Sequence, residues 1–143
     1  MMITDGEGIP LAAHIDSASP AEVNLLEKTL AMITVGKAGE AAGLRRLPDR
    51  LVADKGYDSN LLRTLLSQQG IQPVIPARST NREATHQDGR SMRRYKRRWK
   101  VERTFAWLLS FRRITVRWER YDFIYGAFVH LACALIALRR ICS

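Results

Sequence analysis

The stretch LVADKGYDS, residues 51–59, contains the signals of a strand, a tight turn and a helix start. Its apolar beginning predicts a short strand that ends at Asp54. Gly56 permits a sharp turn, and Ser59 can cap the helix that follows. Ligands of open α/β sheets bind at the carboxyl ends of strands, which makes Asp54 a candidate site residue. An aspartate in this position more often serves a turn or a helix cap, so the stretch alone leaves both interpretations open.

Upstream of this stretch the sequence predicts a hairpin and a helix. A turn signal at residues 4–8 is followed by period-two alternation of apolar residues over 9–15, which is typical of a strand. Only residues 1–3 precede the turn, so the domain is expected to begin in the middle of the hairpin. Residues 19–22 read SPAE, a capping box with proline at the first helical position, and predict a helix over about residues 20–34.

Downstream, leucine spacing predicts a helix whose buried face is formed by Leu61, Leu62, Leu65 and Leu66. Gly70 ends this helix, and residues 71–75 resume as a strand. Residues 77–90 are polar and predict a loop. Two long helices are expected over about residues 92–110 and 122–140. Because strands alternate with helices, the fold class is α/β, with two long C-terminal helices.

Positive charge is concentrated in one part of the chain. The net charge is +9, and residues 90–120 hold 12 Lys and Arg but only two acidic residues, Glu102 and Glu119. A basic stretch inside a folded domain favours a polyanionic partner, most commonly nucleic acid, over a merely solvated basic helix. The 143 residues, 46% of them apolar, suffice for one compact domain.

The last predicted helix carries both cysteines. Cys133 and Cys142 lie on opposite faces of that helix and about 13 Å apart along its axis, so they cannot form a disulfide within it. Two ordinary thiols and no signal peptide favour a reducing cytoplasm. The apolar segment 123–138 is short for a membrane span and contains His130, so a buried core helix capped by Asp122 is expected.

Glu102 lies on the predicted basic helix, at the border between its buried and solvent faces. At 100° per residue, Tyr95, Arg98 and Glu102 fall on one narrow edge of the helix, beside its apolar face. This position is within reach of the sheet. On the helix alone, a salt bridge between Arg98 and Glu102 at i, i+4 is the simpler explanation.

Both segments match the pattern of one family. Residues 53–58, ADKGYD, resemble the second-aspartate motif of insertion-sequence transposases of the DDE type. Tyr95, Arg98 and Glu102 have the spacing of that family's glutamate signature, and Glu102 lies 48 positions after Asp54. Further segments similar to that family are 101–108 (VERTFAWL), 111–113 (FRR) and 127–132 (AFVHLA). The resemblance therefore covers nearly the whole chain.

This resemblance implies a ribonuclease-H-like fold in truncated form. The implied architecture is a mixed sheet flanked by helices, in a single partial domain of residues 1–143 that lacks the first strand. In that family three carboxylates hold two divalent ions, Mg²⁺ or Mn²⁺, and Asp54 and Glu102 match two of them, as catalytic and metal-binding residues. Two metals activate the attacking oxygen and stabilise the leaving oxygen when a DNA phosphodiester is cleaved and joined, and such hard cations take oxygen ligands.

The resemblance also implies partners. The DNA partners would be the insertion-sequence ends and the target, and the expected DNA-binding residues are Tyr95, Arg98, Lys100, Arg103, Arg112, Arg113 and Arg117. Tyr95 and Arg98 would contact the DNA backbone or steady Glu102, and the arginines after that helix would contact phosphates. A homo-oligomer in the active complex, a cytoplasmic, nucleoid-associated location in a bacterium and no membrane partner are expected.

Two departures from the family pattern bear on activity. The family's lysine seven residues after the glutamate is replaced by Leu109. The family's first aspartate lies upstream of the hairpin turn, and Asp5 aligns with the turn itself, so it is assigned no metal. The isolated chain is therefore expected to be inactive unless its first strand is supplied. Two alternatives stay open: a non-catalytic DNA-binding or regulatory fragment that interferes with the full-length transposase, and a small basic nuclease unrelated to transposition.

Aromatic and imidazole side chains add little to this prediction. Trp99, Trp107 and Trp118 lie among basic residues and could stack on unpaired bases. Trp99 is the best placed of the three, although helix packing is the commoner use of such residues. The three histidines have no metal-ligand spacing, and His130 is expected to be a hydrogen-bonded core residue.

Overall fold

The computed structural model describes residues 1–16, 22–34, 47–78 and 93–142. The chain divides into two units: Met1–Leu44 with Lys100–Ser143, and Arg45–Trp99. We call the first the hairpin unit and the second the crossover unit.

Two antiparallel strands, β1 (Met2–Thr4) and β2 (Pro10–Ala13), form the centre of the hairpin unit. Asp5 shapes the turn between them, because its Oδ1 accepts hydrogen bonds from the backbone N–H groups of Glu7 and Ile9, both at 2.8 Å. The predicted hairpin is confirmed, although its second strand is four residues long and shorter than expected.

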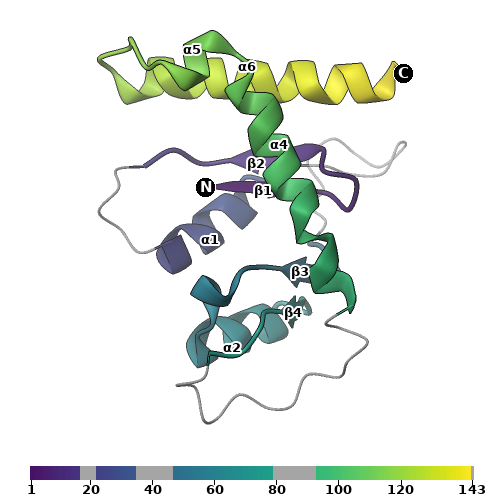
Figure 1. The fold of residues 1–143 in the computed structure, drawn as a ribbon. Coiled ribbons are helices and arrows are strands. Elements are labelled where there is room, and N and C mark those ends of the chain that lie inside the picture. The colour runs from purple at the N-terminus through teal and green to yellow at the C-terminus, as the bar shows by residue number, and fades with distance from the viewer. Residues whose placement is uncertain (17–21, 35–46, 79–92, 143) are drawn as a thin grey trace. The chain divides into compact units, whose positions relative to one another are not determined.

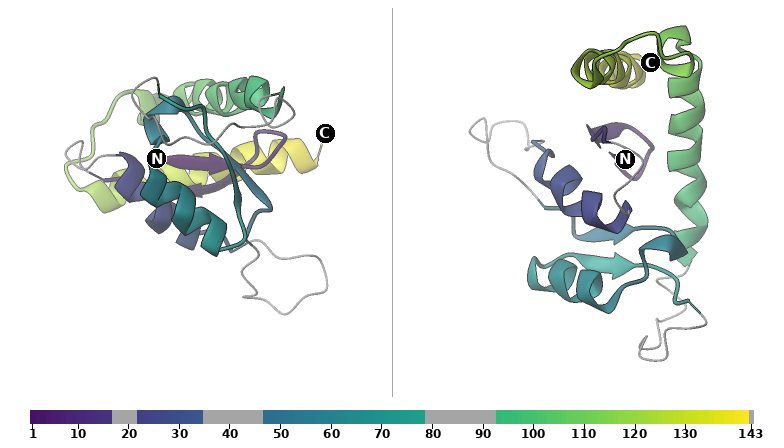
Figure 2. Two further views of the ribbon diagram at one scale, coloured as in Figure 1. Left: turned by 90° about the horizontal axis from the view of Figure 1, so that it is seen from below. Right: turned by 90° about the vertical axis from the view of Figure 1, so that its left-hand side faces the viewer.

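Helices lie on both sides of this hairpin (Figures 1 and 2). Helix α1 (Glu22–Ala31) contacts both strands, and α6 (Asp122–Ile141) contacts β2. The residues that α1 buries are Leu25, Leu26, Thr29 and Leu30. The predicted helix is thus confirmed, and most of its predicted capping box lies outside the described residues.

The predicted basic helix is confirmed with an interruption. Residues 93–95 are helical, Lys96–Arg98 form a 3-10 turn (η2), and α4 (Trp99–Leu109) follows. A short helix, α5 (Arg112–Thr115), then leads towards α6. Leu108 of α4 is buried with two residues of α6 in the core of the hairpin unit.

Only one face of α6 is buried. Ala132 and Ile136 pack with Leu108, and Cys133 borders this cluster. The exposed apolar residues of α6 are Phe123, Leu131, Leu135, Leu138 and Ile141. By length and by its mean hydropathy of 1.5, α6 could cross a membrane, a test that the core helices of soluble proteins also pass. The prediction of a buried core helix is therefore confirmed for one narrow face and wrong for the rest of the helix, which is exposed or half-buried.

Two finer predictions about α6 need correction. The helix begins at Asp122, but its N-cap residue is Tyr121 and no side chain caps it. The Asp122 carboxylate lies in the first turn, where it interacts favourably with the helix dipole. Nε2 of His130 lies 3.0 Å from the backbone O of Ala13, as expected for a hydrogen-bonded histidine. The residue is nevertheless exposed, because it reaches β2 from the border of the buried face.

The crossover unit confirms the predicted order of strand, turn, helix and strand. β3 (Arg50–Val52) pairs in parallel with β4 (Gln72–Val74). The connection consists of a 3-10 turn, η1 (Lys55–Tyr57), and helix α2 (Asn60–Gln68). Gly70 ends α2 with a φ of +76°, a conformation that glycine adopts without steric cost.

The start of α2 matches the prediction, and its buried face does not match fully. The Ser59 hydroxyl accepts a hydrogen bond from the backbone N–H of Leu62 at 3.4 Å and caps the helix. Leu62 and Leu66 are buried, whereas Leu61 is 72% exposed and Leu65 is also exposed. A nine-residue helix that packs on one short strand buries a single i, i+4 stripe, so the neighbouring stripe faces solvent.

The strands of the described residues pair two by two. β1 and β2 form one sheet, and β3 and β4 form another. The buried apolar residues of the crossover unit are Leu51, Leu62, Leu66, Ile71, Val74 and Ile75. The α/β class is confirmed, and the single mixed sheet of a ribonuclease-H-like fold stays a prediction.

Candidate active site

Asp54 lies where the sequence places it, directly after β3 at the start of a turn. It is the N-cap residue of η1, and its Oδ1 accepts a hydrogen bond from the backbone N–H of Lys55. Its side chain is 49% exposed. The capping role expected of such an aspartate is therefore real, and it leaves the carboxylate open to solvent.

Two residues of the glutamate signature contact this carboxylate. Nη1 of Arg98 donates to Oδ2 of Asp54 at 2.9 Å, and the Tyr95 hydroxyl donates to Oδ1 at 3.3 Å. The Arg98 guanidinium also lies over the Tyr95 ring, 5.7 Å from its centroid. All three residues belong to the crossover unit. The sequence predicted that Tyr95 and Arg98 contact DNA or steady Glu102. Their hydrogen bonds to Asp54 were not predicted.

Glu102 lies in the first turn of α4 and is exposed. It belongs to the hairpin unit, whereas Asp54 belongs to the crossover unit. A shared metal site of the two carboxylates therefore stays a prediction.

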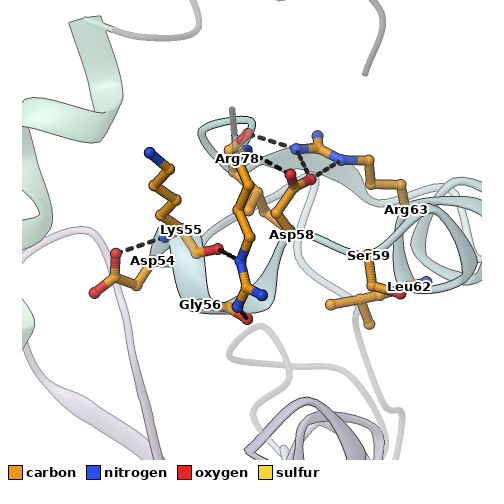
Figure 3. Close-up of polar contacts among 9 residues, drawn as sticks. Asp54, Lys55, Gly56, Asp58, Ser59, Leu62, Arg63 and Arg78 are labelled. Carbon is orange, nitrogen blue, oxygen red and sulfur yellow. Dashed lines mark hydrogen bonds and ion pairs between the residues drawn. The ribbon is translucent and has the colours of Figure 1, made fainter. Parts of the chain in front are cut away.

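A second aspartate of the same motif has a different environment. The Asp58 side chain is 0% exposed, and its Oδ1 accepts hydrogen bonds from Nε and Nη2 of Arg63 at 3.0 and 2.7 Å. Its Oδ2 accepts a hydrogen bond from the backbone N–H of Arg78 at 2.6 Å. The Arg78 guanidinium in turn donates to the backbone oxygens of Lys55 and Gly56 (Figure 3). We call Asp58, Arg63 and Arg78 the turn cluster.

The turn cluster fixes the loop that carries Asp54. Nη2 of Arg63 also donates to the backbone O of Ile75, just after β4, at 2.7 Å. The turn after β3 is thus tied to the chain after β4 by charged hydrogen bonds, which are stronger than neutral ones. Sequence reasoning missed this cluster. The available signal was the second acidic residue of the motif, Asp58, together with an arginine five positions later.

Lys100 and Arg103 contact the hairpin turn within the hairpin unit. Nζ of Lys100 donates to the Glu7 carboxylate at 3.0 Å and to the backbone O of Gly6, and Arg103 donates to the backbone O of Glu7 at 2.8 Å. The hydrogen bond and positive charge of Lys100 lower the pKa of Glu7, and the charge of Arg103 adds to this effect. Both basic side chains, which the sequence predicted to bind DNA, therefore also stabilise the hairpin turn.

The same contact leaves little room for a side chain at Gly8. Its φ is +83°, and an added Cβ would lie 3.1 Å from the backbone O of Lys100 and from Oγ1 of Thr104. The buried Thr104 hydroxyl donates to the backbone O of Gly8 at 2.5 Å. The hairpin turn is thereby fastened to the first two turns of α4, which carry Glu102.

The arginines that follow α4 differ in how strongly they are held. Arg113 donates to Glu119 at 2.8 Å, and Arg117 donates to the backbone O of Glu119 at 3.1 Å and pairs with Asp122. In the described part of the chain, the Arg112 side chain has no hydrogen bond or ion pair. We call residues 112–120, which comprise α5 and the turn after it, the arginine loop.

The donor chemistry of the two predicted metal ligands suits a hard cation. Asp54 and Glu102 offer carboxylate oxygens, which Mg²⁺ and Mn²⁺ prefer. Within the described ranges, no group of three or more His, Cys, Asp or Glu residues could hold a metal ion. Each of the two residues thus fits as one oxygen ligand of such an ion.

The comparisons with known proteins agree with the two motifs. Residues 1–137 match the family model of the transposase DDE domain. The chain therefore belongs to the insertion-sequence transposases of the DDE family, which confirms the family predicted from its sequence.

Two relatives place it more closely. The chain is 40% identical over 135 residues to the transposase assigned to insertion sequence element IS402 of Burkholderia cepacia, over 94% of this chain and 60% of the relative. It is 36% identical over 90 residues to the transposase assigned to element IS6501 of Brucella ovis, over 62% of this chain and 67% of the relative. The chain thus spans less than two thirds of the length of the IS402 relative. No solved structure matches it.

Proposed function

We propose that this chain is a catalytic part of a transposase that cleaves insertion-sequence DNA and joins it to a target. The observation that carries the proposal is the position of Asp54: an exposed carboxylate at the end of β3, in the family's second-aspartate motif, held by two residues of the glutamate signature. Both motifs lie in a chain that belongs to the DDE family.

In this proposal Asp54 and Glu102 hold the divalent metal ions together with a further carboxylate. The metals would supply charge stabilisation at the reacting phosphate oxygens when bound. Arg98 holds the Asp54 carboxylate in place through an exposed ion pair. Such pairs contribute only about 0–1 kcal/mol, so a cation can replace the guanidinium at low cost. Tyr95 fixes the second carboxylate oxygen.

DNA contacts are proposed for the basic residues of the glutamate signature and of the segment after it. Arg112, Arg113 and Arg117 lie in the arginine loop and would bind phosphates, which gives affinity with little sequence preference. Lys100 and Arg103, which fasten the hairpin turn, and Arg98, which holds Asp54, would meet DNA with their remaining donors. The one hydroxyl donor of Tyr95 goes to Asp54, so Tyr95 would meet DNA with its ring or by exchanging that hydrogen bond.

We further propose that both units belong to one ribonuclease-H-like domain, because the family model spans residues 1–137 without a break. The active complex would be a homo-oligomer on the DNA of the bacterial nucleoid, in the cytoplasm. Two DNA ends that are joined in one reaction need more than one active site, which favours at least two protomers.

The test is cleavage of DNA that carries the element's ends, with Mg²⁺ or Mn²⁺, by the chain alone and by the chain supplied with a strand that bears a further aspartate. We expect cleavage only in the second case. Asp54→Asn or Glu102→Gln should abolish cleavage and leave DNA affinity within about threefold, because each removes a metal ligand and only one charge. Asp49→Asn and Glu27→Gln, at exposed positions, are the matched controls. Wild-type cleavage by either site variant would remove that residue from the active site.

A second proposed function rests on the positive charge of residues 90–120, which hold 12 Lys and Arg and favour binding to DNA whether or not DNA is cleaved. Under this proposal the chain is a non-catalytic fragment that binds DNA or interferes with the full-length transposase. Binding to element ends without cleavage in either assay, together with inhibition of an active transposase, would support this function over the first.

A further inference from the structure

The arginine loop lines an open surface cavity on the hairpin unit, to which neither predicted carboxylate contributes. Its volume is about 420 Å³, and it is lined by Arg112, Arg113 and Trp118. This volume lies within the roughly 300–1,000 Å³ of small-ligand sites. The lining combines two cations with one aromatic ring, which is the combination that proteins use to bind single-stranded nucleic acid.

Trp118 is the most exposed of the three tryptophans. Its exposed fraction is 72%, against 50% for Trp99. Arg103 and Arg140 both lie over the Trp107 ring, with their guanidinium carbons 4.7 and 5.4 Å from its centroid. The aromatic face available for stacking is therefore on Trp118, whereas the sequence had favoured Trp99.

The loop that presents Trp118 is held in place. The Glu119 carboxylate, only 6% exposed, accepts hydrogen bonds from Nη1 of Arg113 at 2.8 Å and from the backbone N–H of Trp118 at 3.2 Å. Arg117 donates to the backbone O of Glu119 at 3.1 Å and lies over the Tyr125 ring, 5.3 Å from its centroid. A side chain presented by a preordered loop loses less entropy on binding than one on a free loop.

The charges beside the indole favour an anion. Arg112 has no ion-pair partner within the described part of the chain, and Arg113 keeps a largely exposed guanidinium although it pairs with Glu119. The carboxylate of Glu119 is shielded from the cavity's solvent by its burial. Anionic phosphate and an aromatic base are joined in a nucleotide, and only a base that is not stacked in a duplex can lie on the indole face.

We propose that this cavity binds an unpaired nucleotide of the DNA substrate, with the base on Trp118 and the adjoining phosphate on Arg112 and Arg113. This site rests on the proposed function, since it assumes that the chain binds DNA. It adds a specificity that the phosphate contacts do not provide, namely preference for a strand with an unpaired base over a continuous duplex.

The experiment measures affinity for two labelled DNA molecules of equal length at one salt concentration, a blunt duplex and a duplex with a short single-stranded tail. We expect the unmodified chain to bind the tailed DNA more tightly. Trp118→Ala should lower affinity for the tailed DNA by at least about fivefold and leave the blunt duplex unaffected. Trp118→Phe should keep most of the preference. Trp99→Ala is the matched control at the other exposed tryptophan.

The outcomes separate this site from the proposed function. Equal affinity of the unmodified chain for both DNA molecules, or a preference that Trp118→Ala keeps, overturns the nucleotide site while DNA binding stands. No binding of either DNA removes the proposed function as well. Displacement of tailed DNA by polyglutamate as effectively as by single-stranded DNA would assign the cavity to acidic protein segments instead. Because Trp118 is exposed, its substitution leaves the thermal unfolding midpoint unchanged, which a melting curve checks.

Discussion

The turn cluster and the arginine loop are both rich in arginine, and they use it in opposite ways. In the turn cluster the Asp58 side chain is fully buried, its Oδ1 accepts hydrogen bonds from Arg63, and its Oδ2 accepts one from the backbone N–H of Arg78. In the arginine loop the guanidinium of Arg113 is 61% exposed although it pairs with Glu119. One region uses its charges within the fold, and the other presents them to solvent.

This difference also separates the two aspartates of one motif. Asp58 supports the turn, and Asp54, four positions earlier, keeps an exposed carboxylate. The proposed metal site would need both features, because a ligand must be accessible to the ion and held in position. Substitutions of the buried and of the exposed charged residues test this difference between the two regions.

The largest expected effect is that of Asp58→Ala. It leaves the mostly buried Arg63 without its carboxylate, and breaking a buried ion pair costs about 3–5 kcal/mol of unfolding free energy. Asp54→Ala, which breaks an exposed pair, should cost at most about 1 kcal/mol. Urea denaturation followed by circular dichroism measures both. Equal denaturation midpoints for the two variants would show that the turn cluster does not hold the fold.

Local signals predicted the parts of this site that depend on neighbouring residues. The turn after β3 follows from Gly56, and the start of α2 follows from the Ser59 hydroxyl, whose hydrogen-bond partner is three residues away. The position of Asp54 at a strand end was correct for the same reason. Turns and helix caps depend on residues a few positions apart, so the spacing of these residues predicts them.

Contacts between distant segments could not be predicted in this way. The backbone N–H of Arg78 reaches Asp58 across 20 positions, and Arg98 reaches Asp54 across 44. Which stripe of α2 is buried likewise depends on where β4 lies, so Leu61 and Leu65 were assigned to the core incorrectly. A pattern of residue types fixes which groups are able to pair, and only the fold determines which of them meet.

An intermediate effect is expected at the contact between the hairpin turn and α4. Thr104→Val removes a buried hydroxyl that donates to the backbone O of Gly8 at 2.5 Å and leaves that carbonyl without this donor. The expected cost is about 1–3 kcal/mol of unfolding free energy. Thr64→Val, at an exposed helical position, is the matched control and should change stability by less than about 0.5 kcal/mol. If both variants unfold at the same urea concentration, the basic residues of α4 hold the turn without the threonine.

The smallest effect on stability is expected for Arg112→Ala. No described residue pairs with its side chain, so the unfolding free energy should change by less than about 0.5 kcal/mol. DNA binding should respond instead: the slope of log affinity against log salt should fall by about 0.9, the value for one lost phosphate contact on duplex DNA. Arg113→Ala should lower the slope similarly and also destabilise the fold, because the shielded Glu119 loses its partner. A reversed result, with Arg112 affecting stability and Arg113 affecting only the slope, would contradict the division of labour within the arginine loop.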